Sequence, residues 1–328
     1  MATFKEIRGQ TIKSLSTDPS PLVKGQIWYN STSSTLKCAT PVSASWAAGG
    51  AYPTPTQGLF GGGTQTAGWA AGGFTPTISA NTNEYNGSSW TTTPASFSPP
   101  GRAGGGSAGT QTSALAFGGT VAGPRVGTTN EYDGAAWTVG GTMGTGRDSI
   151  GGCGTQTAGL ASGGFISGPY PSGSTTAVEE YNGASWTAGT ALPGTAGKAD
   201  ISACGTQTTA LTAGGGPVTT AVAQTYNGTS WTTITSLPLA RQAGRMTGDS
   251  TNGLYISGAP APAPTAVNEW TGLAWAADAA IVTGRWAGMV GGGRSDAILS
   301  AGFDGSSALT TTEEYTATGV GIKTITTS

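Results

Sequence analysis

The heptapeptide EYNGSSW, residues 84–90, recurs along the chain with small changes. Its further copies are EYDGAAW from Glu131, EYNGASW from Glu180, TYNGTSW from Thr225 and EWTGLAW from Glu269. Asn-Gly and Asp-Gly are the strongest short signals for a β-hairpin, because both residues tolerate the positive φ of a type I′ turn. Most copies therefore predict a two-residue turn that joins two short strands.

A second phrase, GTQT, repeats in step with the first. Four copies and two degraded versions begin 43 to 51 residues apart, at Gly63, Gly109, Gly154, Gly205, Gly248 and Gly292. A glycine doublet or its remnant follows nine and ten residues after each start. Self-similarity at a fixed period of this length is the signature of a repeat architecture, here with six units.

Each unit divides into four short strands, and no segment carries a useful length of the 3.6-residue apolar period of a helix. Four strands in a unit of this length are typical of a β-propeller blade. Trp46 has no EY pair before it, and Tyr315 has no Trp after it. The sequence thus predicts an all-β, six-bladed β-propeller that is closed by pairing of its N- and C-terminal strands.

The repeated aromatic residues are expected to pack the blades against one another. They are Trp46, Trp90, Trp137, Trp186, Trp231 and Trp275, with Tyr85, Tyr132, Tyr181, Tyr226 and Tyr315. The glutamates of the EY pairs also recur, and we expect them to bond neighbouring turns; they are Glu84, Glu131, Glu180, Glu269 and Glu314.

A cation stands seven residues before the turn phrase in five of the six units. The five are Arg102, Arg147, Lys198, Arg241 and Arg285. We expect each of them to pair with an acid or a carbonyl group of its own blade. The alternative is a ring of cations that holds an anion or an acidic partner.

Composition argues against several kinds of chemistry. The 328 residues include 57 glycines and no histidine, 9% are charged, and the net charge is −2. A nearly neutral chain lacks the basic footprint of nucleic-acid binding. Without histidine, copper sites and His-dependent catalytic triads lack their ligand or base. We therefore expect no enzymatic activity, no cofactor and no metal.

The three cysteines, Cys38, Cys153 and Cys204, are scattered along the chain. Their spacing fits neither a zinc site nor a disulfide framework, so we expect free thiols in a protein that is assembled in a reducing cytoplasm. The sequence shows no apolar segment long enough to span a membrane and no secretory signal at its start.

The order of motifs within a unit resembles the kelch repeat family. An Arg precedes the innermost strand, a Gly-Gly doublet ends the second strand, and a Tyr and a downstream Trp follow. The resemblance covers residues 38–317, which we assign to the propeller, and it implies a kelch-like β-propeller. The Tyr-to-Trp spacing is shorter here than in kelch repeats, so the resemblance implies the architecture and no particular kelch partner.

Residues 1–37 lie outside the period and form an N-terminal arm, in which GQIWYNSTSSTLK (25–37) predicts a hairpin. This arm and the C-terminal tail, 318–328, resemble segments of bacteriophage virion proteins, especially tail fibres and other appendages. The resemblance implies that the arm docks the protein onto the virion. The docking candidates are Phe4, Ile7, Ile27, Trp28 and Tyr29.

Recognition is expected where the repeat varies, in the loops between each glycine doublet and the following EY pair. Aromatic residues on such loops give contact area at small cost in entropy. The candidates for contact with a receptor or partner are Phe74, Phe165, Tyr170 and Phe303.

The resulting hypothesis is a non-enzymatic phage virion protein. Its arm contacts other virion proteins, and its propeller is displayed on the particle exterior to bind a glycan or protein of the host surface, in several copies per particle or as a homo-oligomer. One alternative is a capsid or tail decoration subunit whose propeller only packs against neighbours. Another is a cellular carbohydrate-binding kelch protein. None of these hypotheses includes nucleic-acid binding or insertion into a membrane.

Overall fold

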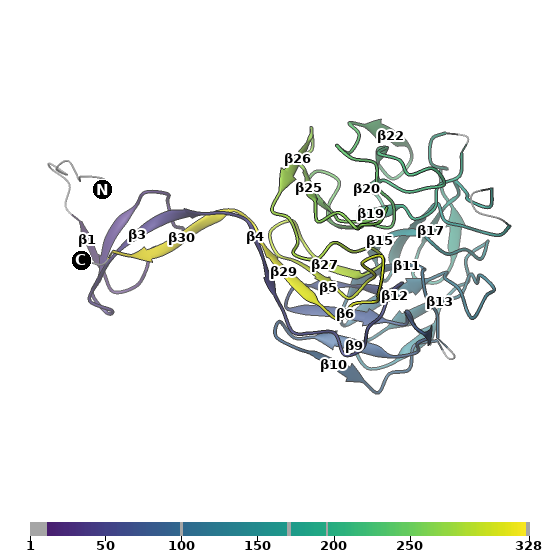
Figure 1. The fold of residues 1–328 in the computed structure, drawn as a ribbon, viewed down its shortest axis with the longest axis horizontal. Helices are drawn as coiled ribbons and strands as arrows, with labels where there is room; N and C mark the ends of the chain where they lie inside the picture. Colours follow the sequence, from purple (N-terminus) through teal and green to yellow (C-terminus); the bar gives the residue numbers. More distant parts are fainter. Residues whose placement is uncertain (1–11, 99–100, 169–171, 195, 326–328) are drawn as a thin grey trace. The chain divides into compact units, whose positions relative to one another are not determined.

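The computed structural model describes residues 12–98, 101–168, 172–194 and 196–325, and these contain strands and no helix (Figure 1). The chain divides into two compact units. The larger unit is Trp46–Thr316, and the smaller one is built from chain on both sides of it, up to Ser45 and from Ala317.

The repeats of the larger unit form four-stranded antiparallel sheets. The first three sheets contain β5 (Phe60–Thr64), β6 (Ala67–Ala71), β9 (Thr82–Tyr85) and β10 (Trp90–Thr93); β11 (Gly106–Thr110), β12 (Ser113–Phe117), β13 (Thr129–Tyr132) and β14 (Trp137–Val139); and β15 (Gly151–Thr155), β16 (Ala158–Ser162), β17 (Val178–Tyr181) and β18 (Trp186–Ala188). The next two contain β19 (Ser202–Gly205), β20 (Ala210–Ala213), β21 (Ala223–Tyr226) and β22 (Trp231–Ile234); and β23 (Arg245–Gly248), β24 (Gly253–Ile256), β25 (Val267–Trp270) and β26 (Trp275–Asp278). A small hairpin, β7 (Phe74–Thr75) and β8 (Thr77–Ile78), lies between β6 and β9.

The sixth sheet joins strands from distant parts of the chain. It contains β27 (Met289–Gly292), β28 (Ala297–Ser300), β29 (Thr312–Thr316) and the N-terminal strand β4 (Ser45–Ala48). The first strand of each sheet contacts the first strand of the next, and β27 contacts β5. This arrangement of radial sheets is that of a β-propeller, as the sequence predicted.

The EYNGSSW hairpin forms with a longer turn than the sequence predicted. Tyr85 pairs with Trp90, so the loop has four residues, 86–89, and not two. Only Gly87 in it has positive φ. The Asn86 Oδ1 atom accepts hydrogen bonds from the backbone N–H groups of Ser88 and Ser89, at 3.0 and 2.9 Å. This side-chain bonding stabilises an Asx-type turn and removes the need for a type I′ turn.

Tyrosine and glutamate of the repeat link neighbouring sheets. The Tyr132 hydroxyl donates to Glu84 Oε1 at 2.8 Å, and the Tyr226 hydroxyl to Glu180 Oε1 at 2.7 Å. Tyr85 makes the same bond to Glu314, between the first sheet and the sixth. Burial, with the bond to the carboxylate as a second cause, raises the pKa of each of these hydroxyls to about 12. These glutamates therefore bond tyrosines of adjacent sheets, not the neighbouring turns that we expected.

The tryptophans pack between sheets as predicted. Trp137 stacks on Tyr132 of its own sheet with a centroid distance of 4.9 Å. Its Nε1–H donates at 2.8 Å to the Thr82 hydroxyl of the preceding sheet. Trp90 makes the equivalent bond to Thr312 of the sixth sheet, at 3.0 Å. Each such residue thus joins two sheets by packing and by one directed bond.

The glutamine of GTQT links adjacent sheets, a role that the sequence analysis did not assign. Gln207 Nε2 donates to the backbone oxygens of Gly159 and Tyr181 at 3.0 and 2.7 Å. Gln65 donates in the same way to Ala297 and Tyr315 in the sixth sheet, at 3.1 and 2.7 Å. Gln111 and Gln156 make the same pair of bonds, so the glutamine links four of the six sheet boundaries of the described propeller.

The smaller unit is a four-stranded sheet in the order β1 (Lys13–Leu15), β2 (Ile27–Asn30), β3 (Thr35–Val42) and β30 (Gly319–Thr324). The predicted hairpin is present as the antiparallel pair of β2 and β3, whereas β1 lies parallel to β2. The sequence analysis separated an arm, 1–37, from a tail, 318–328. In the structure β3 crosses the first of these boundaries and pairs with β30, so segments that precede and follow the propeller share one sheet.

Candidate functional site

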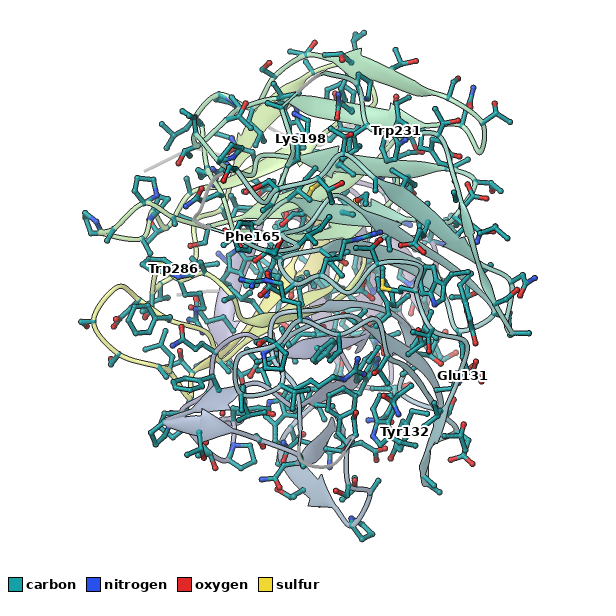
Figure 2. All side chains as sticks on the ribbon, turned by 90° about the vertical axis from the view of Figure 1, so that its right-hand side faces the viewer. Glu131, Tyr132, Phe165, Lys198, Trp231 and Trp286 are labelled. Atoms are coloured by element: carbon teal, nitrogen blue, oxygen red, sulfur yellow. The ribbon has the colours of Figure 1, made fainter. Side chains whose placement is uncertain are left out.

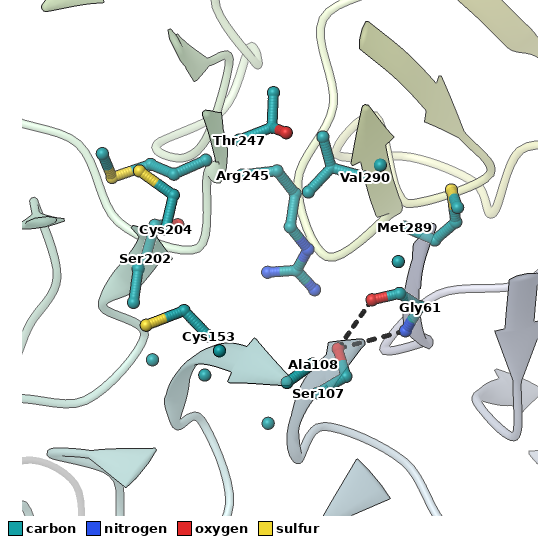
Figure 3. Close-up of a pocket in the computed structure, with 18 of the residues that line it drawn as sticks. Gly61, Ser107, Ala108, Cys153, Ser202, Cys204, Arg245, Thr247, Met289 and Val290 are labelled. Carbon is teal, nitrogen blue, oxygen red and sulfur yellow. Dashed lines mark hydrogen bonds between the residues drawn. The ribbon is translucent and has the colours of Figure 1, made fainter. Parts of the chain in front are cut away.

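The first strands of the six sheets surround a cavity of about 170 Å3 (Figure 3). Its lining is rich in glycine, including 61–63 and 291–292, and glycine leaves space where a larger side chain would fill it. The hydroxyl of Ser107 donates to the Gly61 carbonyl at 2.8 Å, and that of Ser202 donates to the Gly244 carbonyl at 2.5 Å. Both hydroxyls therefore serve the backbone of the strands.

Arg245 alone carries a charge among the described residues that line this cavity, and its guanidinium points into it (Figure 3). The Nε–H donates to the Gly288 carbonyl, and Nη1 donates to the Gly244 carbonyl at 3.2 Å. Desolvation lowers the pKa of Arg245, and the charge of Asp200 acts in the opposite direction. The site therefore holds a partly desolvated positive charge.

A cycle of backbone hydrogen bonds lies at the rim of the cavity. Each N–H donates to the carbonyl of the equivalent residue in a neighbouring sheet, at 2.6 to 3.1 Å, and the six residues are Gly58, Gly104, Ser149, Asp200, Ala243 and Ala287. All six have positive φ, although four are not glycine. The residue after most of them lines the cavity. At the four residues that are not glycine, the same bond maintains a strained backbone.

The partner candidates from the loops share one position relative to this rim. Phe74, Phe165 and Phe303 each form a β-bridge to the residue just before a rim residue. Figure 2 shows Phe165 and Trp286 toward one side of the propeller, left in this view, with Glu131 and Tyr132 to the right. Each of the three phenylalanines directly follows the glycine doublet or its remnant, so the repeat brings all three to equivalent places.

These candidates differ in exposure. Phe74 is 41% exposed, whereas Phe165 is only 7% exposed. Arg125 covers the Phe165 ring, with the guanidinium carbon 4.3 Å from the centroid, and pairs with Asp148 at 3.0 Å. Phe165 is therefore a buried anchor and not the exposed contact that we expected. Half-buried Phe303 packs on Trp286 at 5.3 Å. Tyr170 lies outside the described residues.

The docking candidates of the arm also differ in burial. Trp28 is fully buried, and its Nε1–H donates to Asp18 Oδ1 at 2.9 Å, so it holds the small sheet together. Ile27 is half-buried, and Tyr29 is 39% exposed. Phe4 and Ile7 lie outside the described residues. Of the described candidates, Tyr29 presents the most surface to a partner.

The arginines of the repeat are buried in their own sheets. Arg102 donates to the carbonyl of Gly118 at 2.7 Å and to Asn130 Oδ1 at 2.7 Å. Arg147 pairs with Glu179 at 2.6 Å, and desolvation lowers the pKa of both arginines. The same position holds half-buried Lys198 in the next sheet. The arginines therefore act within their blades, as expected, and do not form an open cationic ring.

Within the described ranges, no group of three or more Cys, Asp and Glu side chains is placed to hold a metal ion. The cysteines Cys38, Cys153 and Cys204 are free thiols. No helix that is long and apolar enough to cross a membrane occurs in the described part of the chain.

Comparison with known proteins supports the fold. The chain is similar to the solved structure of YjhT, with a TM-score of 0.68, 12% identity, and coverage of 83% of this chain and 99% of that one. No protein family matches the chain, and no curated protein matches it. At this identity the similarity establishes a β-propeller fold and transfers no activity.

Proposed function

We propose that this chain is a non-enzymatic structural protein of a bacteriophage virion, an appendage or tail-fibre subunit that displays a six-bladed propeller for attachment to the host surface. The observation that carries the proposal is the division into two units. The small sheet joins strands from the arm, β1, β2 and the start of β3, to β30 from the C-terminal segment, and these are the segments with virion-like sequence. Such a unit can attach to the particle while the propeller remains free to bind.

A count of six blades and a closed ring are part of this proposal. They are supported by β4, which completes the sheet of β29, and by the contact of β27 with β5. The bonds of Tyr85, Trp90 and Gln65 to the sixth sheet support them as well. In this closure β4 covers the edge of β29 that would otherwise be unpaired, which suits a durable particle protein.

The receptor-binding surface that we propose is the rim of the cavity with the phenylalanines beside it. Phe74 and Phe303 are the aromatic contacts of this surface. Phe165 supports its own loop from the buried side. A host-surface glycan fits such a rim, because sugars pack on aromatic rings and bond to nearby polar groups.

A decoration role on the capsid or tail is the second candidate. It is favoured by large apolar side chains that are exposed at or beside outer strands, Val139 at 76%, Leu273 at 82% and Val282 at 77%. Neighbouring subunits in a particle would cover these side chains.

Immunogold electron microscopy of purified particles, with antibody against the full chain, tests the virion role. The expected result is gold at a defined position on the particle, at an appendage for the first candidate and over the capsid or tail surface for the second. Recovery of the protein only from particle-free host fractions would refute both. Glycan-array binding by the full chain, lost in Phe74→Ala and retained in Val139→Thr, would assign receptor binding to the rim.

A further inference from the structure

Arg245 places a charge where the fold does not require one. Every first strand has a residue three positions before its turn glycine, and this residue pairs with the second strand in the same way in all six sheets. The residues at the other five positions are uncharged: Phe60, Gly106, Gly151, Ser202 and Met289. Since five sheets form with a neutral residue here, the arginine has a role other than strand formation.

The guanidinium is incompletely paired. Within the described part of the chain its two hydrogen bonds go to the carbonyl oxygens of Gly288 and Gly244, and neither uses Nη2. The ion pairs of the described chain do not include Arg245, and Asp200 lies beyond ion-pair distance. The half-buried guanidinium has no described carboxylate within ion-pair distance, so an anion that enters the cavity gains a charge-assisted interaction.

The cavity has room for such an anion. At about 170 Å3 it is many times the roughly 10–15 Å3 of solvent-accessible volume that one water molecule requires. The hydroxyl groups of Ser107 and Ser202 donate to backbone carbonyls, and the hydrogen bonds of the Arg245 guanidinium within the described chain go to neither of them. Arginine matches the planar or tetrahedral oxygens of carboxylate, sulfate and phosphate, because its donors form a rigid fork.

We propose that the central cavity binds a small oxyanion, a carboxylate, sulfate or phosphate group, through the Arg245 guanidinium. The group enters either as a free ion or as the charged substituent of an acidic sugar. This site is independent of the virion role: it can exist in a decoration subunit or a cellular protein, and it can be absent from a host-binding propeller.

Thermal melting of the purified full chain tests the proposal, with sodium sulfate in the millimolar range against sodium chloride at equal ionic strength. A second series compares the Tm in methyl glucuronide with the Tm in methyl glucoside, which lacks the carboxylate. At a ligand concentration ten times Kd we expect the Tm to rise by about 2–5 °C. In Arg245→Met the rise should disappear, and this variant should still fold because Met289 stands at the equivalent position. Arg245→Gln provides a second neutral variant.

Arg294→Met is the matched control. It removes one positive charge from the propeller, in an ion pair with Glu269 outside the cavity lining, and should keep the full response to anion. A rise in Tm with both sulfate and glucuronide assigns the site to oxyanions from either source. A rise with sulfate alone assigns the site to free ions, and a rise with glucuronide alone assigns it to acidic sugars. An equal response in wild type and both Arg245 variants would reflect only general salt effects and would overturn the proposal. No response in wild type to any probe would overturn it as well.

Discussion

Replacement of Gln65 by alanine tests whether the first and sixth sheets are joined as strongly as sheets inside the repeat. Gln65 Nε2 makes two hydrogen bonds to the sixth sheet, at 3.1 and 2.7 Å. Gln207 makes two equivalent bonds between the third and fourth sheets, at 3.0 and 2.7 Å, and both side chains belong to half-buried residues. At about 0.5–1.5 kcal/mol for each bond, either alanine variant should lose about 1–3 kcal/mol of unfolding free energy.

The assay is thermal unfolding followed by circular dichroism and calorimetry. A loss of this size lowers the Tm by about 2–10 °C for a unit of this length. In a closed ring, Gln65→Ala and Gln207→Ala should give the same decrease, because each removes one link of a continuous cycle. If Gln65→Ala melts like wild type while Gln207→Ala melts lower, the first and sixth sheets do not form a stable boundary in solution, and the reasoning for closure fails.

Three further predictions follow from buried or paired groups. Arg147→Met should lower the free energy of unfolding, measured in urea, by about 3–5 kcal/mol, because the Glu179 carboxylate then stays buried without its ion-pair partner at 2.6 Å. The double variant Arg147→Met with Glu179→Gln should recover much of this loss. Hydrogen bonds from three side chains, Lys37 first, then Asn30 and Trp28, lower the pKa of Asp18 to about 2. The small sheet should therefore keep this stabilisation above pH 4 and lose it between about pH 4 and 2. Hydrogen exchange in β2 should detect that change, and Asp18→Asn should remove the pH dependence. A thiol reagent should modify one cysteine in the folded chain and three after denaturation, because burial raises the pKa of two thiols, those of Cys153 and Cys204.

The repeat in the sequence was sufficient to predict the sheets and the packing role of the aromatic residues. Periodic spacing fixes which residues share a position, and the sixth sheet follows from the unmatched Trp46 and Tyr315. The turn length was not predicted correctly, because the outcome depends on bonding by the Asn86 side chain and not on backbone preference alone. The burial of Phe165 was not predictable either, because the side chain that covers it, Arg125, belongs to the preceding repeat.

Departures from the repeat have two different meanings in this propeller. In the last two units the glutamine of the turn is replaced by Ser250 and Arg294. Arg294 pairs with Glu269 of the adjacent sheet, so this substitution exchanges one contact between sheets for another. At Ser250 only the backbone carbonyl is used, which accepts a bond from Trp270 within its own sheet. Arg245 differs, because it adds a charge that no described carboxylate pairs with and that the equivalent strands omit. A substitution that makes a new contact between sheets, as at Arg294, is explained by the scaffold. A substitution that directs a hydrogen-bond donor into the cavity, as at Arg245, supports the proposal of a bound ligand.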